Sequence, residues 1–95
     1  MKKTVTTSNA LLLECAVILN QRGEVYGSAD KVFGSIAGQW SNFLGKEISK
    51  SDTAIMMAQM KIARLAQGID DQEAKKDTFL DAINYIALAY ECEQP

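Results

Sequence analysis

Four charged residues in the second half of the chain have spacings that bring their side chains together on helices. Lys61 and Arg64 are three residues apart, and Asp77 and Asp81 are four apart, so each pair shares one helix face. Lysine and arginine attract phosphate, which the guanidinium binds through a fork of donors. Two carboxylates hold magnesium only if a facing helix adds further ligands. The cations therefore indicate a phosphate site and the aspartates a metal site; ion pairs between the two sets, or exposure to solvent, are the structural alternative.

Three other side chains have the chemistry to contact a nucleotide. Tyr26 lies in the segment 21–27, which contains two glycines and is expected to be a loop. Tyr26 or Trp40 would stack on a base, a contact worth roughly 1–3 kcal/mol. Asn84 would read a base or ribose edge. The structural alternatives are a turn in which Tyr26 packs over the helix ends and a Trp40 that belongs to the core.

Composition limits the class of protein. The 95 residues form a single domain, and a net charge of -2 argues against strong binding to duplex DNA or RNA. The chain has no histidine, so a histidine-based nucleophile–base pair is excluded and a zinc site is disfavoured. Cys15 and Cys92 have no paired spacing, which indicates a reducing compartment.

The N-terminal segment raises the question of targeting. Met1-Lys2-Lys3 is basic and Leu11-Leu12-Leu13 is apolar, as in a signal peptide. Glu14 interrupts this apolar run, which is also too short to span a membrane. We expect a cytoplasmic protein without a membrane partner.

The spacing of apolar residues and helix caps predicts an all-α fold of about four helices. The expected helices cover residues 9–21, 29–44, 49–67 and 72–91, and the expected N-caps are Ser8, Ser28 and Ser49. Gly23, Gly45 and Gly68 are expected to end the first three. Residues 1–7 and 92–95 are expected to be flexible.

The apolar faces predict an oligomer. The first and third helices are apolar on more sides than a four-helix monomer covers. In the last helix the expected core face is Phe79, Ile83, Ile86 and Tyr90. Asp77, Asp81 and Asn84 then lie on the opposite side.

Several short motifs recur in an order that resembles a small phage-encoded family of uncharacterised helical domains. They are Tyr26-Gly27-Ser28, Phe33, Ile36-Ala37, Trp40, Leu44-Gly45, Glu47-Ile48-Ser49, Met56-Met57, Lys61-Ile62-Ala63-Arg64-Leu65, Asp81 and Tyr85. The resemblance covers residues 12–89. That family is in turn distantly similar to the all-helical, MazG-like nucleotide pyrophosphohydrolases.

Those enzymes hold magnesium with a Glu-x-x-Glu pair on one helix and a Glu-x-x-Asp pair on the next. Here the segment 57–61 has no acidic pair, and Thr78 stands where the second pattern has glutamate, although Asp81 fits its aspartate. The resemblance therefore implies a nucleotide-sized pocket more strongly than it implies turnover.

We interpret the chain as a phage protein of the host cytoplasm that binds a nucleotide or nucleotide-derived signal without hydrolysing it. One concrete version is sequestration, as a sponge, of a host anti-phage defence signal such as a cyclic oligonucleotide or an ADP-ribose derivative. The ligand-binding residues are then Tyr26, Lys61, Arg64 and Asn84, with no catalytic residue and no cofactor. A magnesium-dependent pyrophosphohydrolase using Asp77 and Asp81 is one alternative. An inhibitor that binds a host protein directly is the other.

Overall fold

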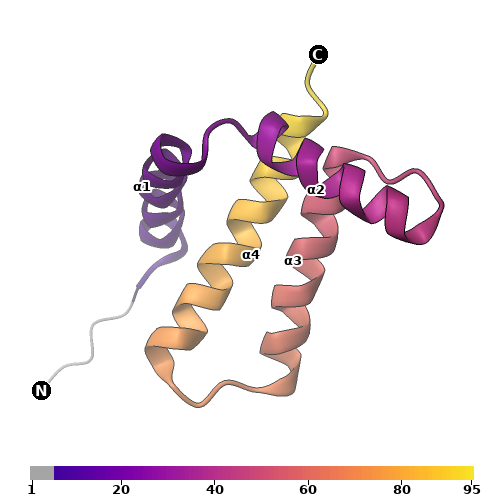
Figure 1. The fold of residues 1–95 in the computed structure, drawn as a ribbon. Coiled ribbons are helices and arrows are strands. Elements are labelled where there is room, and N and C mark those ends of the chain that lie inside the picture. The colour runs from indigo at the N-terminus through magenta and orange to yellow at the C-terminus, as the bar shows by residue number, and fades with distance from the viewer. Residues whose placement is uncertain (1–5) are drawn as a thin grey trace, which may run out of the picture.

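The computed structural model describes residues 6–95, which form four α-helices and no strand. These are α1 (Ser8–Tyr26), α2 (Ala29–Leu44), α3 (Lys50–Gln67) and α4 (Gln72–Cys92). Figure 1 shows α3 and α4 side by side as an antiparallel hairpin, with α2 across its upper end and α1 beside α4. The predicted all-α class and the predicted number of helices are confirmed.

Each helix begins at a side-chain cap. The side chains of Thr7, Ser28, Ser49 and Asp71 each accept a hydrogen bond from a backbone N–H of the first turn that follows. Gly45 then ends α2 in the left-handed conformation, with φ of 65°, which a side chain with a Cβ disfavours. The predicted bounds of α2 and α3 are therefore confirmed, because caps and glycines mark both ends of each helix.

The first helix is longer than predicted. Gly23 does not end it; the helix continues to Tyr26, and Gly27 is the residue at its C-cap. A mid-helix glycine costs only about 1 kcal/mol relative to alanine, which tertiary contacts can offset. The segment 21–27 is thus the last turn of α1 and not a loop.

Small side chains line the contact between α3 and α4. Ala54 and Ala58 on α3, and Ala82 and Ala89 on α4, are all less than 7% exposed. Side chains of this size let two helix backbones approach closely over a long contact. The hairpin formed by these helices has the most extensive contact between any two helices of the protein.

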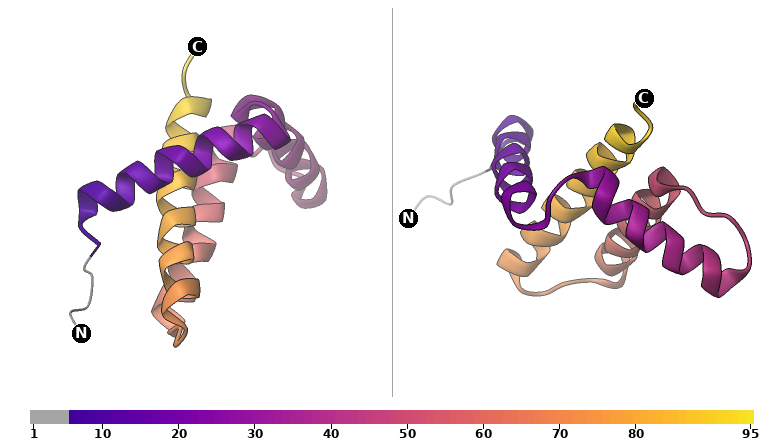
Figure 2. Two further views of the ribbon diagram at one scale, coloured as in Figure 1. Left: turned by 90° about the vertical axis from the view of Figure 1, so that its left-hand side faces the viewer. Right: turned by 45° about the horizontal axis from the view of Figure 1, so that its top comes forward.

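The other two helices pack on this hairpin at different places. Phe33 of α2 is 3% exposed, joins a core cluster with Ala54 and Ala89, and meets the ring of Tyr85 edge-on, with 6.2 Å between centroids. Figure 2 shows α1 crossing α4 at a steep angle. There Cys15 is buried, and its thiol points to the backbone carbonyl of Leu80, with 4.0 Å between sulfur and oxygen.

The predicted core face of α4 is wrong. Phe79 is 44% exposed, Ile86 is 54% exposed and Tyr90 is 68% exposed. Asn84, which was predicted to lie on the other side, is buried instead. The inward face of α4 is thus the face that carries small and polar side chains.

The flexibility of the two chain ends stays a prediction. Residues 1–5 lie outside the described residues. Thr7 caps α1, and Cys92 is the last residue of α4 and packs against the core cluster. Both thiols are free, and burial is the main cause that raises the pKa of each. Among the described helices, none has the length and apolarity needed to cross a membrane.

We expect Phe33→Ala to lower the free energy of unfolding by about 3–5 kcal/mol, because it empties the centre of the core cluster. Phe43→Ala is the matched control: the Phe43 side chain is 87% exposed, so its loss should change stability by less than about 0.5 kcal/mol. Urea unfolding followed by circular dichroism measures both. Equal losses in the two variants would contradict the packing described for α2.

Candidate functional site

A groove of about 770 Å³ lies between the C-terminal half of α1, the start of α2 and one face of α4. Its volume falls in the range of pockets that bind small molecules, roughly 300–1,000 Å³. Its polar and aromatic lining comes from all three helices and consists of Asn20, Arg22, Tyr26, Ser28, Asp81, Asn84, Tyr85 and Glu91. The groove therefore combines an apolar wall with a few groups that could orient a ligand.

Asn84 is the unusual residue of this groove. Its side chain is 2% exposed, and neither its amide nitrogen nor its amide oxygen has a hydrogen-bond partner within residues 6–95. A buried polar group without a partner costs roughly 1–3 kcal/mol. Asn84 thus places a donor and an acceptor just beneath the wall of the groove, where no group of residues 6–95 pairs with them.

A charged triad lies beside Asn84, one helical turn toward the start of α4. One carboxylate oxygen of Asp81 lies 3.1 Å from the guanidinium of Arg22, and the other lies 3.1 Å from the ammonium of Lys61. The side chains of Asp81 and Lys61 are 18% and 14% exposed, whereas that of Arg22 is half exposed. Asp81 thus joins α1, α3 and α4. The triad has two cations and one anion, and Glu91 in the groove lining balances its net positive charge.

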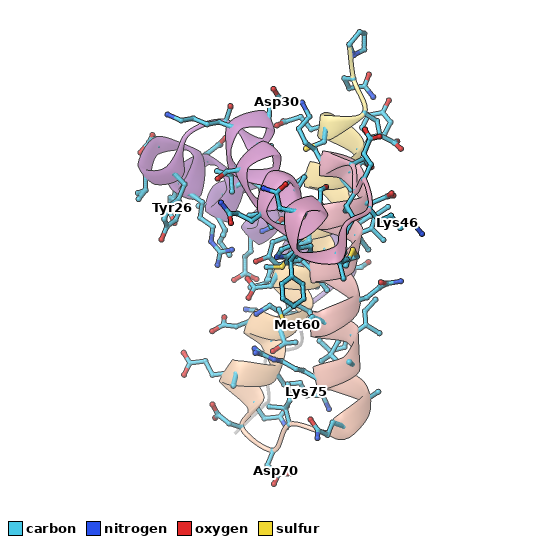
Figure 3. The ribbon with its side chains drawn as sticks, turned by 45° about the vertical axis from the view of Figure 1, so that its right-hand side comes forward. Tyr26, Asp30, Lys46, Met60, Asp70 and Lys75 are labelled. Carbon is cyan, nitrogen blue, oxygen red and sulfur yellow. The ribbon has the colours of Figure 1, made fainter. Side chains whose placement is uncertain are left out.

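The structure brings together some of the predicted ligand-binding residues. Tyr26 and Asn84 line the same groove. Lys61 does not line it but forms an ion pair with Asp81, which does. Arg64 does not line it; this side chain is exposed in the last turn of α3. Figure 3 shows Tyr26 where α1 ends, on the other side of α2 from Lys46. Trp40 is half-buried in α2 and lies outside the groove.

Arg22 is the groove residue that sequence reasoning missed. It lies in the segment that was predicted to be a loop, so no helix face was assigned to it. Continuing α1 through Gly23 places Arg22 seven residues after Cys15, on the same buried side of the helix. That spacing was the signal available in the sequence.

The two aspartates of the alternative metal site line a second, smaller pocket. This pocket of about 310 Å³ contains both Asp77 and Asp81, together with Arg22. Each carboxylate oxygen of Asp81 already lies 3.1 Å from a cationic nitrogen, and these cations repel a metal ion. Within residues 6–95 no cluster of three or more carboxylate or thiol side chains surrounds a possible metal position. As they stand, these residues do not fit a magnesium site.

Comparison with known families gives one match. The model of the family described as Domain of unknown function (DUF6378) matches residues 11–93, so the chain belongs to that family. Comparisons with curated proteins and with solved structures found no significant match.

We expect Asp81→Asn to lower the free energy of unfolding by about 1–3 kcal/mol, because it leaves the mostly buried ammonium of Lys61 without its anion. Asp77→Asn provides the control, since Asp77 is exposed and should be replaceable at a cost below about 0.5 kcal/mol. Denaturant unfolding at two salt concentrations measures the difference. If both variants were as stable as the parent, the triad would not hold the three helices together.

Proposed function

We propose that this member of a family of unknown function binds a nucleotide-type small molecule in the groove between α1, α2 and α4. The proposal rests on the geometry of the described residues, because the family description assigns no activity. Its central support is the side-chain amide of Asn84, which has a donor and an acceptor buried in the groove wall without partners.

An asparagine amide presents a donor and an acceptor side by side. This pattern matches the edge of a nucleobase, and asparagine makes such a paired contact with adenine. Both amide atoms are covered in this conformation, so a ligand reaches them when the side chains over Asn84 shift. A ligand that supplies the complementary pair would then satisfy both atoms. The resulting gain would include relief of the cost that the unliganded protein carries, so the amide favours a ligand with such an edge.

The rim of the groove supplies the other contacts that a nucleotide needs. Tyr26 is 68% exposed, so its ring is free to stack on a base at about 1–3 kcal/mol. The guanidinium of Arg22 is half exposed and bound on one side by Asp81. An incoming phosphate would share Arg22 with Asp81, while Lys61 keeps that carboxylate neutralised.

Binding without hydrolysis is the form of this function that we favour. The half-exposed guanidinium of Arg22 offers a contact for a phosphate, and the two cations around Asp81 oppose a metal ion. In a phage setting, the concrete version to test is sequestration of a host defence signal, such as a cyclic oligonucleotide or an ADP-ribose derivative. In that role a protein needs only affinity and abundance.

Asn84→Leu tests the central observation. Leucine has a similar volume and no polar atoms, so the free energy of unfolding of the variant should be about 1–2 kcal/mol higher than that of the parent. The variant should also lose its affinity for the ligand. Thermal and urea unfolding measure the first effect. A variant less stable than the parent would mean that Asn84 has a structural partner, and the proposed role of its amide would be wrong.

A binding panel tests the ligand class. Calorimetry with ATP, AMP, ADP-ribose and cyclic dinucleotides, without and with magnesium, should find at least one ligand that binds the parent. The affinity of this ligand should fall about 10- to 100-fold in Arg22→Gln, because a charge-assisted hydrogen bond of roughly 1.5–3 kcal/mol is lost. Arg64→Gln is the matched control and should bind like the parent, since Arg64 is outside the groove. Loss of affinity in Arg64→Gln alone would place the site on α3. Release of pyrophosphate or a monophosphate with magnesium would favour the pyrophosphohydrolase alternative.

A further inference from the structure

Both helices of the hairpin carry a mainly apolar stripe that the rest of the described chain leaves mostly exposed. On α3 the stripe is Ile55, Gln59, Ile62 and Ala66, and on α4 it is Phe79, Ile83, Ile86 and Tyr90. Each stripe follows the spacing i, i+4, i+7, i+11, which is typical of a helix that packs along another helix. We call the surface formed by these eight residues the outer face.

The outer face lies on the side of the hairpin away from α2. On α4 it is about half a turn from Asp81, Asn84 and Leu88, which line the groove with α1 and α2. The left view of Figure 2 shows α2 on one side of the hairpin and the first half of α1 extending past the other side. The outer face is therefore an open wall, bounded along one edge by α1.

The exposure of this face indicates an interface. Five of its eight residues are large apolar side chains that are each more than 40% exposed: Ile55, Ile62, Phe79, Ile86 and Tyr90. A contiguous exposed apolar patch of this kind marks a surface that binds another protein. Among the buried apolar side chains of residues 6–95, only Phe33 and Leu80 are large, so one chain contains little core of its own.

We propose that the outer face binds the same face of a second copy, so that two hairpins form one four-helix bundle. The spacing of the stripes supplies the pattern for packing, and the exposed apolar side chains of the two stripes are what such a dimer would cover. The groove remains open on the opposite side of each hairpin, so this inference does not depend on the proposed ligand.

Charges at the two ends of the face select an antiparallel arrangement. Asp52 continues the stripe on α3, three residues before Ile55, and Lys75 continues the stripe on α4, four residues before Phe79. The helices are antiparallel, so these charges lie at opposite ends of the hairpin; Figure 3 shows Lys75 near the end that carries Asp70. A two-fold axis that lies in the plane of the interface and is perpendicular to the helices brings Asp52 of each copy toward Lys75 of the other. A two-fold axis parallel to the helices brings like charges to the same end.

Light scattering and sedimentation of the full chain test the interface. The parent should be a dimer at micromolar concentration, and Ile86→Glu should raise the dissociation constant by roughly 100-fold or more, since two charges enter each interface. Phe43→Glu is the control, because Phe43 is 87% exposed on α2, on the opposite side of the hairpin, and this variant should remain dimeric. Circular dichroism checks that each variant is folded. A monomeric parent, or an Ile86→Glu variant that stays dimeric, would overturn the proposal, as would a parent that pairs only with a host protein.

A charge exchange tests the arrangement without disturbing the apolar stripes. Asp52→Lys should weaken the dimer by about fivefold, and combining it with Lys75→Asp should restore the parent affinity. The effect should shrink at high salt. A double variant weaker than either single variant would overturn the antiparallel arrangement. Ligand binding by monomeric Ile86→Glu would show that the groove and the interface are separate properties.

Discussion

The close contact between α3 and α4 is the constraint on which the rest of the structure depends. Alanines such as Ala54, Ala58, Ala82 and Ala89 bring the two backbones together, and they leave little room for large side chains between the helices. Large apolar residues are therefore displaced to the outside of the hairpin. α2 covers part of one side through Phe33, and α1 is fixed at one edge of α4 through Cys15.

This arrangement also places polar groups in the interior. The side of α4 that faces α1 and α2 carries Asp81 and Asn84, and the two side chains differ in whether neighbouring residues pair with them. Asp81 is satisfied by Arg22 and Lys61 from two other helices, whereas both polar atoms of the Asn84 amide lack partners. A satisfied ion triad stabilises the packing of helices. An unsatisfied amide in a groove wall does not, and this contrast separates a structural polar group from a candidate recognition group.

Much of the fold could be predicted from local signals. Ser28, Gly45, Ser49 and Gly68 mark the ends of α2 and α3 by capping chemistry, which depends on nearby residues alone. Gly23 misled the prediction for α1, because a glycine signals a helix end only when no tertiary contact supports the helix beyond it. The place of Arg22 in the groove was therefore not predicted, because Arg22 lies in that turn.

The orientation of α4 could not be read from hydrophobicity. Phe79 and Ile86 were assigned to the core because they are among its largest apolar residues. That assignment assumes that the largest apolar side chains are buried within a single chain. The small residues of the α3–α4 contact carry a weaker hydrophobic signal, and the proposed second copy would bury the rest. The same assumption missed the burial of Asn84, which helical spacing placed with two aspartates on what was taken as the outer side, although its amide was predicted to contact a ligand. Tyr26 was singled out for its aromatic ring, and the structure places it in the same groove.

The most direct test of the account is an NMR titration that follows the side-chain amide of Asn84, assigned by comparison with Asn84→Leu. With a nucleotide from the binding panel, the account predicts large shifts of that amide and of the Arg22 side-chain N–H, with small changes at Arg64. Saturable binding of a nucleotide that leaves the Asn84 amide unshifted would contradict the claim that the groove between α1, α2 and α4 is the binding site.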